Sequence, residues 1–445
     1  MTLSSTVLRP GAGPIGATGA PAQRISRLAG MPLPELRAAL HRQLFDEILP
    51  FWDRYGIDDE HGGIICALDY DGKRVHEQKL LWFQGRGLWV YSFLYNHFGR
   101  DGHFLEVSVR IKDFLLRHAL QSDGWWAEVM SREGKVLRPF SGELEGMYFV
   151  AEGLQEYAAA TGDAGALDMA RDLLKKLFGA FISPNFRYLG ADYPYLWGSQ
   201  RAVRPQGLWF LTLSVATEML ERWPDRELEA IADAGVDAIL NRHYDSELGL
   251  NTEMLYDDFT RPPGEEKKVR FGHCVEALWM LMDEADRRRD SALWAACAER
   301  VRRHLDAGWD HVYGGLIQWV NVDHDSYEWP PETPPGTNLD MHFVGEYEYM
   351  KTLWGLNETM IATLKVLERT PSGWAEEYFD ACYMLAQEKF CQRSRGYSAG
   401  YMGFTDRRMT PQAHVNRQDN YHLPRQLMLN LLSLDRMIAG AEAKS

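Results

Sequence analysis

The sequence has few cysteines, no long apolar run and no cluster of basic residues. Its five cysteines are odd in number and lack CxxC spacing, which argues against a disulfide framework or a zinc site and predicts a reducing, cytoplasmic location. No run of about 18 apolar residues is present, so no membrane-spanning helix is expected. With 48 basic and 63 acidic residues, the net charge of −15 disfavours nucleic acid and membrane surfaces as partners.

The N-terminal segment differs in composition from the rest of the chain. Residues 1–30 are rich in Gly, Ala, Pro and Ser and lack a continuous apolar core, which predicts a disordered tail rather than a secretory signal. No Pro- or Gly-rich linker divides residues 31–445, so we expect them to form one domain. That domain is rich in Trp, Tyr and Phe; most of these rings must be core, but some can line a sugar pocket.

Helical periodicity dominates after the tail. Apolar residues recur at i, i+3, i+4 and i+7 in about twelve segments, namely 33–55, 80–98, 104–120, 147–160, 164–180, 205–222, 226–240, 271–288, 291–308, 346–367, 373–390 and 423–440. Short turns such as Gly99-Arg100-Asp101 and Thr161-Gly162-Asp163, which also supply an N-cap, alternate with loops of roughly 20–35 residues.

This alternation predicts an all-α toroid, a ring of six helical hairpins. Gly pairs followed by alternating apolar residues, at 59–64 and 310–316, predict short β-hairpins within the long loops. If the short turns lie at one end of the ring, the long loops lie at the other end. The functional site is expected at the end that carries the long loops.

Helices that follow the long loops begin with polar and aromatic side chains. Trp82, Arg86 and Trp89 share one helical face, and an arginine on an inner helix needs a carboxylate or an oxyanion-like ligand. His273 and Glu276 are spaced i, i+3, so that this carboxylate can orient the imidazole or raise its pKa. Each group could equally be a structural ion pair or a helix-surface contact.

Two later segments show comparable patterns. Lys351, Trp354 and Glu358 are spaced by three and four residues, and His422 precedes Pro424 in the first turn of the last helix. The segment 204–209 is polar for one turn and then apolar, which is typical of a pocket wall. No HExxH spacing, GxGxxG loop, Walker loop or GxSxG elbow is present, so we predict neither a metal nor a cofactor.

Taken together, these stretches resemble the N-acylglucosamine 2-epimerase superfamily, which also contains cellobiose 2-epimerases and aldose–ketose isomerases. The resembling stretches are 82–86, 272–277, 350–358 and 421–425, in the family's order and across nearly the whole chain after residue 33. The resemblance implies an (α/α)6 barrel, catalysis without a metal, and often a homodimer. It also implies that His273 and His422 are the general acid/base pair, Arg86 the active-site arginine, and Glu276 and Glu358 pocket carboxylates.

Three departures from the family pattern alter the expected sugar-contacting walls. Leu353-Trp354 replaces a Trp pair, Tyr401-Met402-Gly403-Phe404 replaces Trp-Phe-Gly-Tyr, and Leu208 stands where cellobiose 2-epimerases have a further histidine. The substrate is therefore left open. The side chains that we predict to contact it are Trp82, Trp89, Glu145, Glu276, Lys351, Trp354 and Glu358.

The chemistry of a 2-epimerase explains these residue types. The enzyme removes a proton from C2 of an open-chain aldose and returns one to the opposite face, which two histidines from different helices can do. A fixed Arg86 would stabilise the enediolate. We expect a 2-epimerase acting on N-acylglucosamine, N-acylmannosamine or a related aldose. The alternatives are an aldose–ketose isomerase, an inverting glycoside hydrolase that uses Glu145, Glu276 or Glu358, and a non-catalytic sugar-binding toroid.

Overall fold

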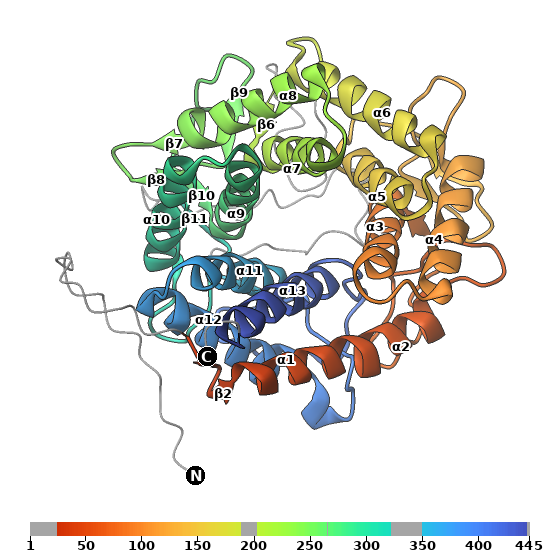
Figure 1. The fold of residues 1–445 in the computed structure, drawn as a ribbon. Coiled ribbons are helices and arrows are strands. Elements are labelled where there is room, and N and C mark those ends of the chain that lie inside the picture. Colours follow the sequence, from red (N-terminus) through yellow and green to blue (C-terminus); the bar gives the residue numbers. More distant parts are fainter. Residues whose placement is uncertain (1–24, 188–202, 265, 322–348, 443–445) are drawn as a thin grey trace.

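The computed structural model describes residues 25–187, 203–264, 266–321 and 349–442. Within these ranges twelve helical segments form two concentric rings (Figure 1). The inner ring consists of α3 (Leu81–His97), α5 (Glu145–Thr161), α7 (Gln206–Arg222), α9 (Phe271–Arg288), α11 (Leu353–Arg369) and α13 (His422–Glu442). The outer ring consists of α1 (Leu33–Arg42), α4 (Gly102–Phe114), α6 (Ala164–Ile182), α8 (Arg226–Asp237), α10 (Ser291–Gly308) and α12 (Gly373–Leu385).

Four outer helices are prolonged by π-helical turns. Helix α1 continues through Gln43–Ile48, α2 (Leu49–Phe51) and Trp52–Gly56, and the other extensions are Leu115–Ala119, Ala238–Arg242 and Ala386–Phe390. Residues Arg393–Arg395 form a 3-10 turn. The twelve predicted helices are thus present, and the predicted ring of six helical hairpins is confirmed.

Short antiparallel strands join the loops between the hairpins. One sheet has three strands, in the order β3 (Lys79–Leu80), β4 (Val129–Met130) and β5 (Val136–Arg138). The other sheets are pairs: β1 (Arg27–Leu28) with β2 (Met31–Pro32), β6 (Val203–Pro205) with β9 (Met254–Tyr256), β7 (Tyr244–Asp245) with β8 (Leu250–Asn251), β10 (Lys268–Arg270) with β11 (Trp319–Asn321), and β12 (Lys351–Thr352) with β13 (Phe404–Thr405). In most of these pairs the two strands come from different loops, so the pairing joins neighbouring loops.

Burial differs between the two rings because their surroundings differ. Outer helix α8 buries Leu228, Ile231, Ala232 and Gly235, the single apolar stripe of a surface helix. Inner helices are covered on nearly all sides; in α3 every residue from 83 to 94 is buried. A Cβ on Gly153 of α5 would lie 2.7 Å from the backbone oxygen at position 85, so glycine allows α3 and α5 to pack closely.

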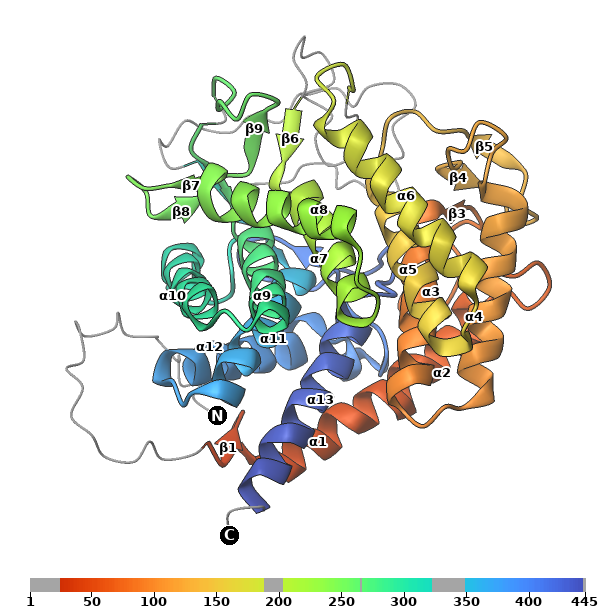
Figure 2. The same ribbon diagram turned by 45° about the horizontal axis from the view of Figure 1, so that its top comes forward.

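The two ends of the barrel are built differently, as Figure 2 shows. At one end, short turns begin the outer helices, where Asp101, Asp163, Asp225 and Asp290 cap the first turns by accepting backbone N–H groups. At the other end, β3, β6, β10 and β12 lead directly into α3, α7, α9 and α11. The first turns of the inner helices therefore all lie at the long-loop end, as the sequence predicts.

A repeated polar cluster anchors two of the long loops. In the first, Lys79 Nζ donates to Asp58 Oδ2 at 2.8 Å and to the Gly62 carbonyl at 2.6 Å. In the second, Lys351 Nζ donates to Asp310 Oδ2 at 3.0 Å and to the Gly314 carbonyl at 2.7 Å. Both glycines have positive φ, as the predicted Gly-pair turns require. The two turns are thus held by buried ion pairs.

Several boundaries differ from the sequence-based prediction. The helix predicted from 346 begins at Leu353, because Lys351 and Thr352 pair with β13 as a strand. Residues 25–30, assigned to the tail, belong to the fold: Leu28 is 1% exposed and the Ala29 N–H donates to Asp380. Residues 1–24 of the predicted tail, and 188–202 and 322–348 of two long loops, lie outside the described residues. Among the described helices none is long and apolar enough to cross a membrane.

Candidate active site

A cavity of about 110 Å³ lies at the long-loop end of the barrel. All six inner helices contribute to it through their first turns, because the strands and loops that precede them end at this level. Polar and aromatic lining residues include Trp82, Arg86, Glu145, His273, Glu276, Trp354, Asp419 and His422. Seven of these eight, all except Asp419, are residues that the sequence predicts for the site.

Each of the two lining histidines is held by a buried glutamate. His273 Nδ1 lies 2.8 Å from Glu253 Oε1, and His422 Nδ1 lies 2.9 Å from Glu358 Oε1. Both carboxylates are fully buried, and the imidazoles are only 13% and 12% exposed. A carboxylate that accepts a hydrogen bond from Nδ1–H favours the tautomer in which Nε2 has a free lone pair, which is the form that a general base needs.

Trp354 lies between the two imidazoles. Its ring centroid is 5.5 Å from that of His273 and 5.7 Å from that of His422. Gly272 makes room for this ring, since a Cβ there would lie 2.3 Å from the end of the Trp354 indole. The two histidines, 149 positions apart in the sequence, therefore converge on one cavity across a single aromatic ring.

Arg86 is buried among aromatic rings. Its guanidinium lies 4.1 Å from the ring centroid of Phe149, 4.9 Å from that of Tyr421 and 5.1 Å from that of Trp82. Burial lowers the pKa of Arg86, and the nearby Asp419 opposes this change. Its buried Nε atom has no hydrogen-bond partner among the described residues, so the side chain retains a donor for an anionic or oxyanion-like ligand.

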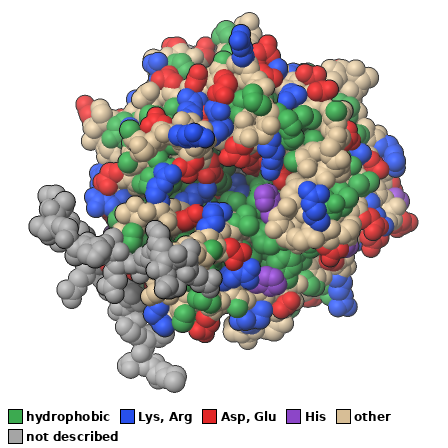
Figure 3. Space-filling model, in the orientation of Figure 1, with side chains coloured by type: hydrophobic (Ala, Val, Ile, Leu, Met, Phe, Trp, Pro, Cys, Tyr) green, Lys and Arg blue, Asp and Glu red, His purple; other side chains and the backbone are tan. Residues whose placement is uncertain are grey.

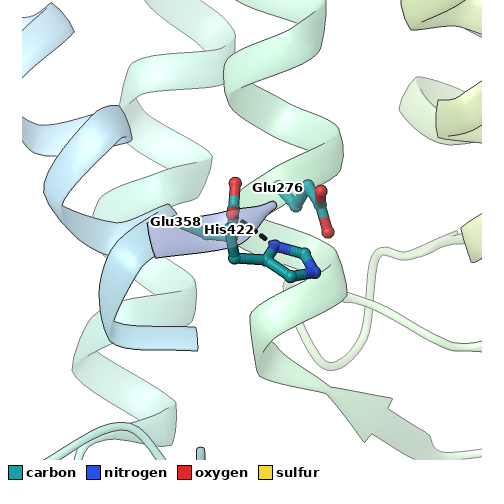
Figure 4. A group of neighbouring side chains, drawn as sticks. All are labelled: Glu276, Glu358 and His422. Carbon is teal, nitrogen blue, oxygen red and sulfur yellow. Dashed lines mark hydrogen bonds and ion pairs between the residues drawn. The ribbon is translucent and has the colours of Figure 1, made fainter. Parts of the chain in front are cut away.

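Glu276, Glu358 and His422 form a compact group at the cavity wall, with Glu276 and His422 lining the cavity and Glu358 behind them (Figure 4). Their potential ligand atoms lie within 4.8 Å of one another, a spacing that could hold a metal ion. The two carboxylates need a positive charge between them, and Arg425 supplies it, because its Nη2 donates to Oε1 of both Glu276 and Glu358. Burial by itself would raise the pKa of Glu358, but Arg425 and His422 lower it to about 2.

A further buried carboxyl, Glu152, extends this network away from the cavity. Glu152 Oε1 accepts a hydrogen bond of 2.6 Å from the Tyr421 hydroxyl, whose oxygen accepts one of 3.1 Å from Arg425. Burial raises the pKa of Glu152 to about 7, although the Tyr421 bond opposes the rise. The network thus joins α5, α9, α11 and α13 in the middle of the barrel.

Three sequence-based assignments need correction. Glu276 does not orient His273; Glu253 does, from the loop before β10, while Glu276 binds Arg425. Lys351 does not face the cavity, because it lies on strand β12 and its ammonium group forms an ion pair with Asp310. Trp89 lies two turns below Trp82, outside this cavity, and its indole nitrogen is 3.3 Å from Glu218.

The other predicted contacts are brought together as expected or nearly so. Trp82, Glu145, Glu276 and Trp354 line the cavity, and so does the predicted wall from Pro205 to Leu208. Glu358 lies behind His422 rather than on the cavity surface. The residues that sequence reasoning did not select are Glu253, Arg417, Asp419 and Arg425. Only Arg425 carries a local signal, since it follows Tyr421 by one helical turn.

The Glu253 contact makes a specific prediction. In Glu253→Gln, the buried His273 Nδ1 loses its carboxylate, so we expect kcat to fall by about 10²-fold with little change in KM, because imidazole tautomer and orientation affect the proton transfer. Steady-state kinetics of the purified variant would measure this. The matched control is Glu247→Gln, an exposed glutamate on the same loop. An unchanged kcat in Glu253→Gln would show that His273 does not depend on this carboxylate.

Comparison with known proteins bears on both the fold and the family. A family model described as N-acylglucosamine 2-epimerase matches residues 62–424. The N-acylglucosamine 2-epimerase of Mus musculus is 28% identical over 294 residues, which cover 63% of this chain and 68% of that protein. The family-model match begins before α3 and ends in the first turn of α13.

Solved structures support the barrel architecture. Cellobiose 2-epimerase from Bacillus thermoamylovorans B4167 aligns with a TM-score of 0.74 at 16% identity, over 90% of this chain and 99% of that one. A D-mannose isomerase aligns with a TM-score of 0.69 at 13% identity, over 92% of this chain and 98% of that one. The predicted (α/α)6 barrel is confirmed by these likenesses.

Proposed function

Because the chain belongs to the N-acylglucosamine 2-epimerase family, it is a carbohydrate epimerase, and we propose that it interconverts N-acylglucosamine and N-acylmannosamine or a closely related pair of aldoses. The observation that carries this proposal is the pair of histidines on one cavity, each with a buried glutamate on Nδ1. Two such bases suit a reaction that removes a proton from one face of a carbon and returns one to the other.

The proposed mechanism assigns one histidine to each face of C2. In one direction His273 or His422 removes the C2 proton through Nε2, and the other histidine, protonated, delivers a proton to the opposite face. In the reverse direction the two exchange roles. Glu253 and Glu358 stabilise the imidazolium that forms on their own histidine, since each carboxylate is buried and within hydrogen-bond distance.

Arg86 is assigned to the enediolate intermediate. Removal of the C2 proton places negative charge on the aldehyde oxygen, and a preorganised cation in an aromatic, partly dry site stabilises that charge strongly. The orphaned Nε of Arg86 and its position on the cavity wall support this role.

The wall formed by α7 supports an N-acylated substrate. Pro205, Leu208, Phe210 and Leu211 line the cavity with apolar surface, and the Phe210 ring centroid lies 5.2 Å from that of His273. A substituent on C2 would lie beside the base that acts on C2. An acyl group gains from contact with an apolar wall, whereas a free hydroxyl would lose hydrogen bonds to water there.

Two alternatives predict different chemistry. An aldose–ketose isomerase uses the same enediolate but reprotonates C1, so its product is a ketose. An inverting glycoside hydrolase needs two carboxyl groups about 6.5–9.5 Å apart, one of them protonated. Glu276 and Glu358 instead share Nη2 of Arg425, and the pKa of Glu358 is lowered to about 2, which suits neither role.

Turnover in deuterated water tests the proposal. With N-acetylmannosamine as substrate, we expect N-acetylglucosamine that carries solvent deuterium at C2, detected by NMR and mass spectrometry. Glucose, mannose and fructose are run in parallel, and we expect the N-acylated sugars to react at least tenfold faster. Formation of a ketose would identify an isomerase. Deuterium-free product, or no reaction with any of these sugars, would contradict the proposed function.

Location and assembly are part of the same proposal. A reducing, cytoplasmic compartment is supported by the five cysteines, all of which are buried and free. A homodimer is implied by the family resemblance and would be checked by light scattering of the purified protein.

A further inference from the structure

A second cavity, of about 290 Å³, lies at the short-turn end of the barrel. Figure 3 shows this end, where the surface is hollowed near the centre of the ring. The cavity is lined by the C-terminal halves of the inner helices, including Trp89, Phe93, Glu218, Glu221, Trp279 and Asn430. We call it the lower cavity. Its volume is near the lower limit of small-molecule sites, roughly 300 Å³.

Four acidic residues (Glu156, Glu218, Glu221 and Asp283) and four basic residues (Arg222, Lys365, Arg425 and Arg436) line the lower cavity. The basic lining residues already have carboxylate partners: Arg222 binds Glu156, Lys365 binds Asp283, and Arg436 binds Glu368. Among the described residues, no basic group lies within ion-pair distance of Glu218 or Glu221. The inner helices also end here, and helix C-termini carry partial negative charge. The electrostatics of the lower cavity therefore favour a cation.

The aromatic and amide lining narrows the chemical class of the ligand. Trp89 and Phe93 stack on each other with ring centroids 4.7 Å apart, and the Arg425 guanidinium already lies 5.2 Å from the ring centroid of Trp279, so these rings form an apolar wall. Asn430 is 1% exposed and lines the cavity, and its Nδ2 has no hydrogen-bond partner among the residues that the structure describes. A buried amide donor without a partner is costly and is satisfied by a hydroxyl or carbonyl oxygen. A ligand that fits these features carries a positive amine and an oxygen acceptor such as a hydroxyl group.

The lower cavity is separate from the histidine cavity. Arg425 and Trp279 form the partition between them: both line the lower cavity, and both donate to Glu358, Arg425 Nη2 at 2.7 Å and Trp279 Nε1 at 2.8 Å. Glu358 in turn holds His422. A ligand in the lower cavity would thus contact the partners of a histidine-bound carboxylate without entering the histidine cavity.

We propose that the lower cavity is a second binding site, specific for a small hydroxylated amine of the amino-sugar class, with Glu218 and Glu221 binding the ammonium group and Asn430 a hydroxyl oxygen. Burial raises the pKa of both glutamates, and neighbouring carboxylates raise each further. A bound ammonium would lower these pKa values, so binding should release protons.

Calorimetric titration with glucosamine tests this proposal without reference to turnover. We expect saturable binding to the wild-type protein and equally to His273→Asn, with proton release seen as a different heat in buffers of different ionisation enthalpy. In Glu218→Gln/Glu221→Gln the affinity should fall at least tenfold. Glutamine resembles a protonated glutamate, so this variant should fold, and its melting temperature verifies that.

Three outcomes would overturn the proposal. The first is an absence of binding heat with glucosamine. The second is binding that persists in the double variant but is weakened in His273→Asn, or is competitive with the sugar substrate, since the ligand would then occupy the histidine cavity. The third is equal binding of glucitol, which has the hydroxyl groups but no amine, because charge would then not determine the recognition.

Discussion

Replacing His422 with Asn is expected to stop net epimerisation, with kcat lower by about 10²- to 10⁴-fold, the contribution typical of a positioned acid or base. The asparagine amide can still donate to Glu358, which otherwise accepts from His422 Nδ1, so the buried carboxylate keeps a partner and the fold should persist. Steady-state kinetics in both directions, with circular dichroism as the check on folding, measure the effect. His273→Asn should behave in the same way.

Isotope exchange makes this prediction sharper. With one base removed, the remaining histidine still removes and returns the proton on its own face. Each single variant should therefore exchange the C2 proton of one epimer with deuterated water and not of the other, and the two variants should differ in which epimer they exchange. His103→Asn, on the surface, is the matched control. Full epimerase activity in either active-site variant would refute the two-base mechanism.

Replacing Arg425 with Met is expected to lower the free energy of unfolding by about 3–5 kcal/mol, because removal of one partner of a buried ion pair leaves uncompensated charge. Arg425 is 2% exposed and is the shared partner of Glu276 and Glu358, which are also buried. Without it, two carboxylates face each other in a dry interior. Thermal unfolding would show a much lower melting temperature, together with lost activity.

The control for this variant lies on the same helix. Arg436, also on α13, pairs with Glu368, but its side chain is 57% exposed, so Arg436→Met should cost at most about 1 kcal/mol. Arg425→Lys retains the charge but cannot span both carboxylates with the same geometry, and an intermediate loss is expected. If Arg425→Met and Arg436→Met melted at the same temperature, the central ion network would not be needed for stability.

The site residues that sequence reasoning found share one property: they lie in the first turns of the inner helices. Trp82, His273, Trp354 and His422 are each within three residues of a helix start. Local signals, namely apolar periodicity and the position of long loops, are enough to place such residues at one end of the barrel. The same logic misplaced Lys351, because an apolar helical pattern cannot show that the preceding residues pair as a strand.

The glutamates that bind His273 and Arg425 could not be predicted from local sequence patterns. Spacing suggested Glu276 for His273, since residues three apart share a helix face. In the fold, Glu253, which lies between β8 and β9, contacts His273 on α9, and Glu276 accepts from Arg425 on another helix. Which acidic side chain pairs with which basic one depends on the distances between helices that are far apart in the sequence. Those distances are set by tertiary packing.

The sequence by itself determined the ring of hairpins, the end at which the cavity opens and the two histidines that face it, because helix periodicity, turn chemistry and loop length are properties of neighbouring residues. Only the tertiary structure decided which glutamate holds each imidazole, that Arg425 neutralises the carboxylates at the cavity wall, and that a second cavity exists at the other end. Those features arise between residues from 20 to 149 positions apart on different elements, where pairing depends on the packed distances between those elements.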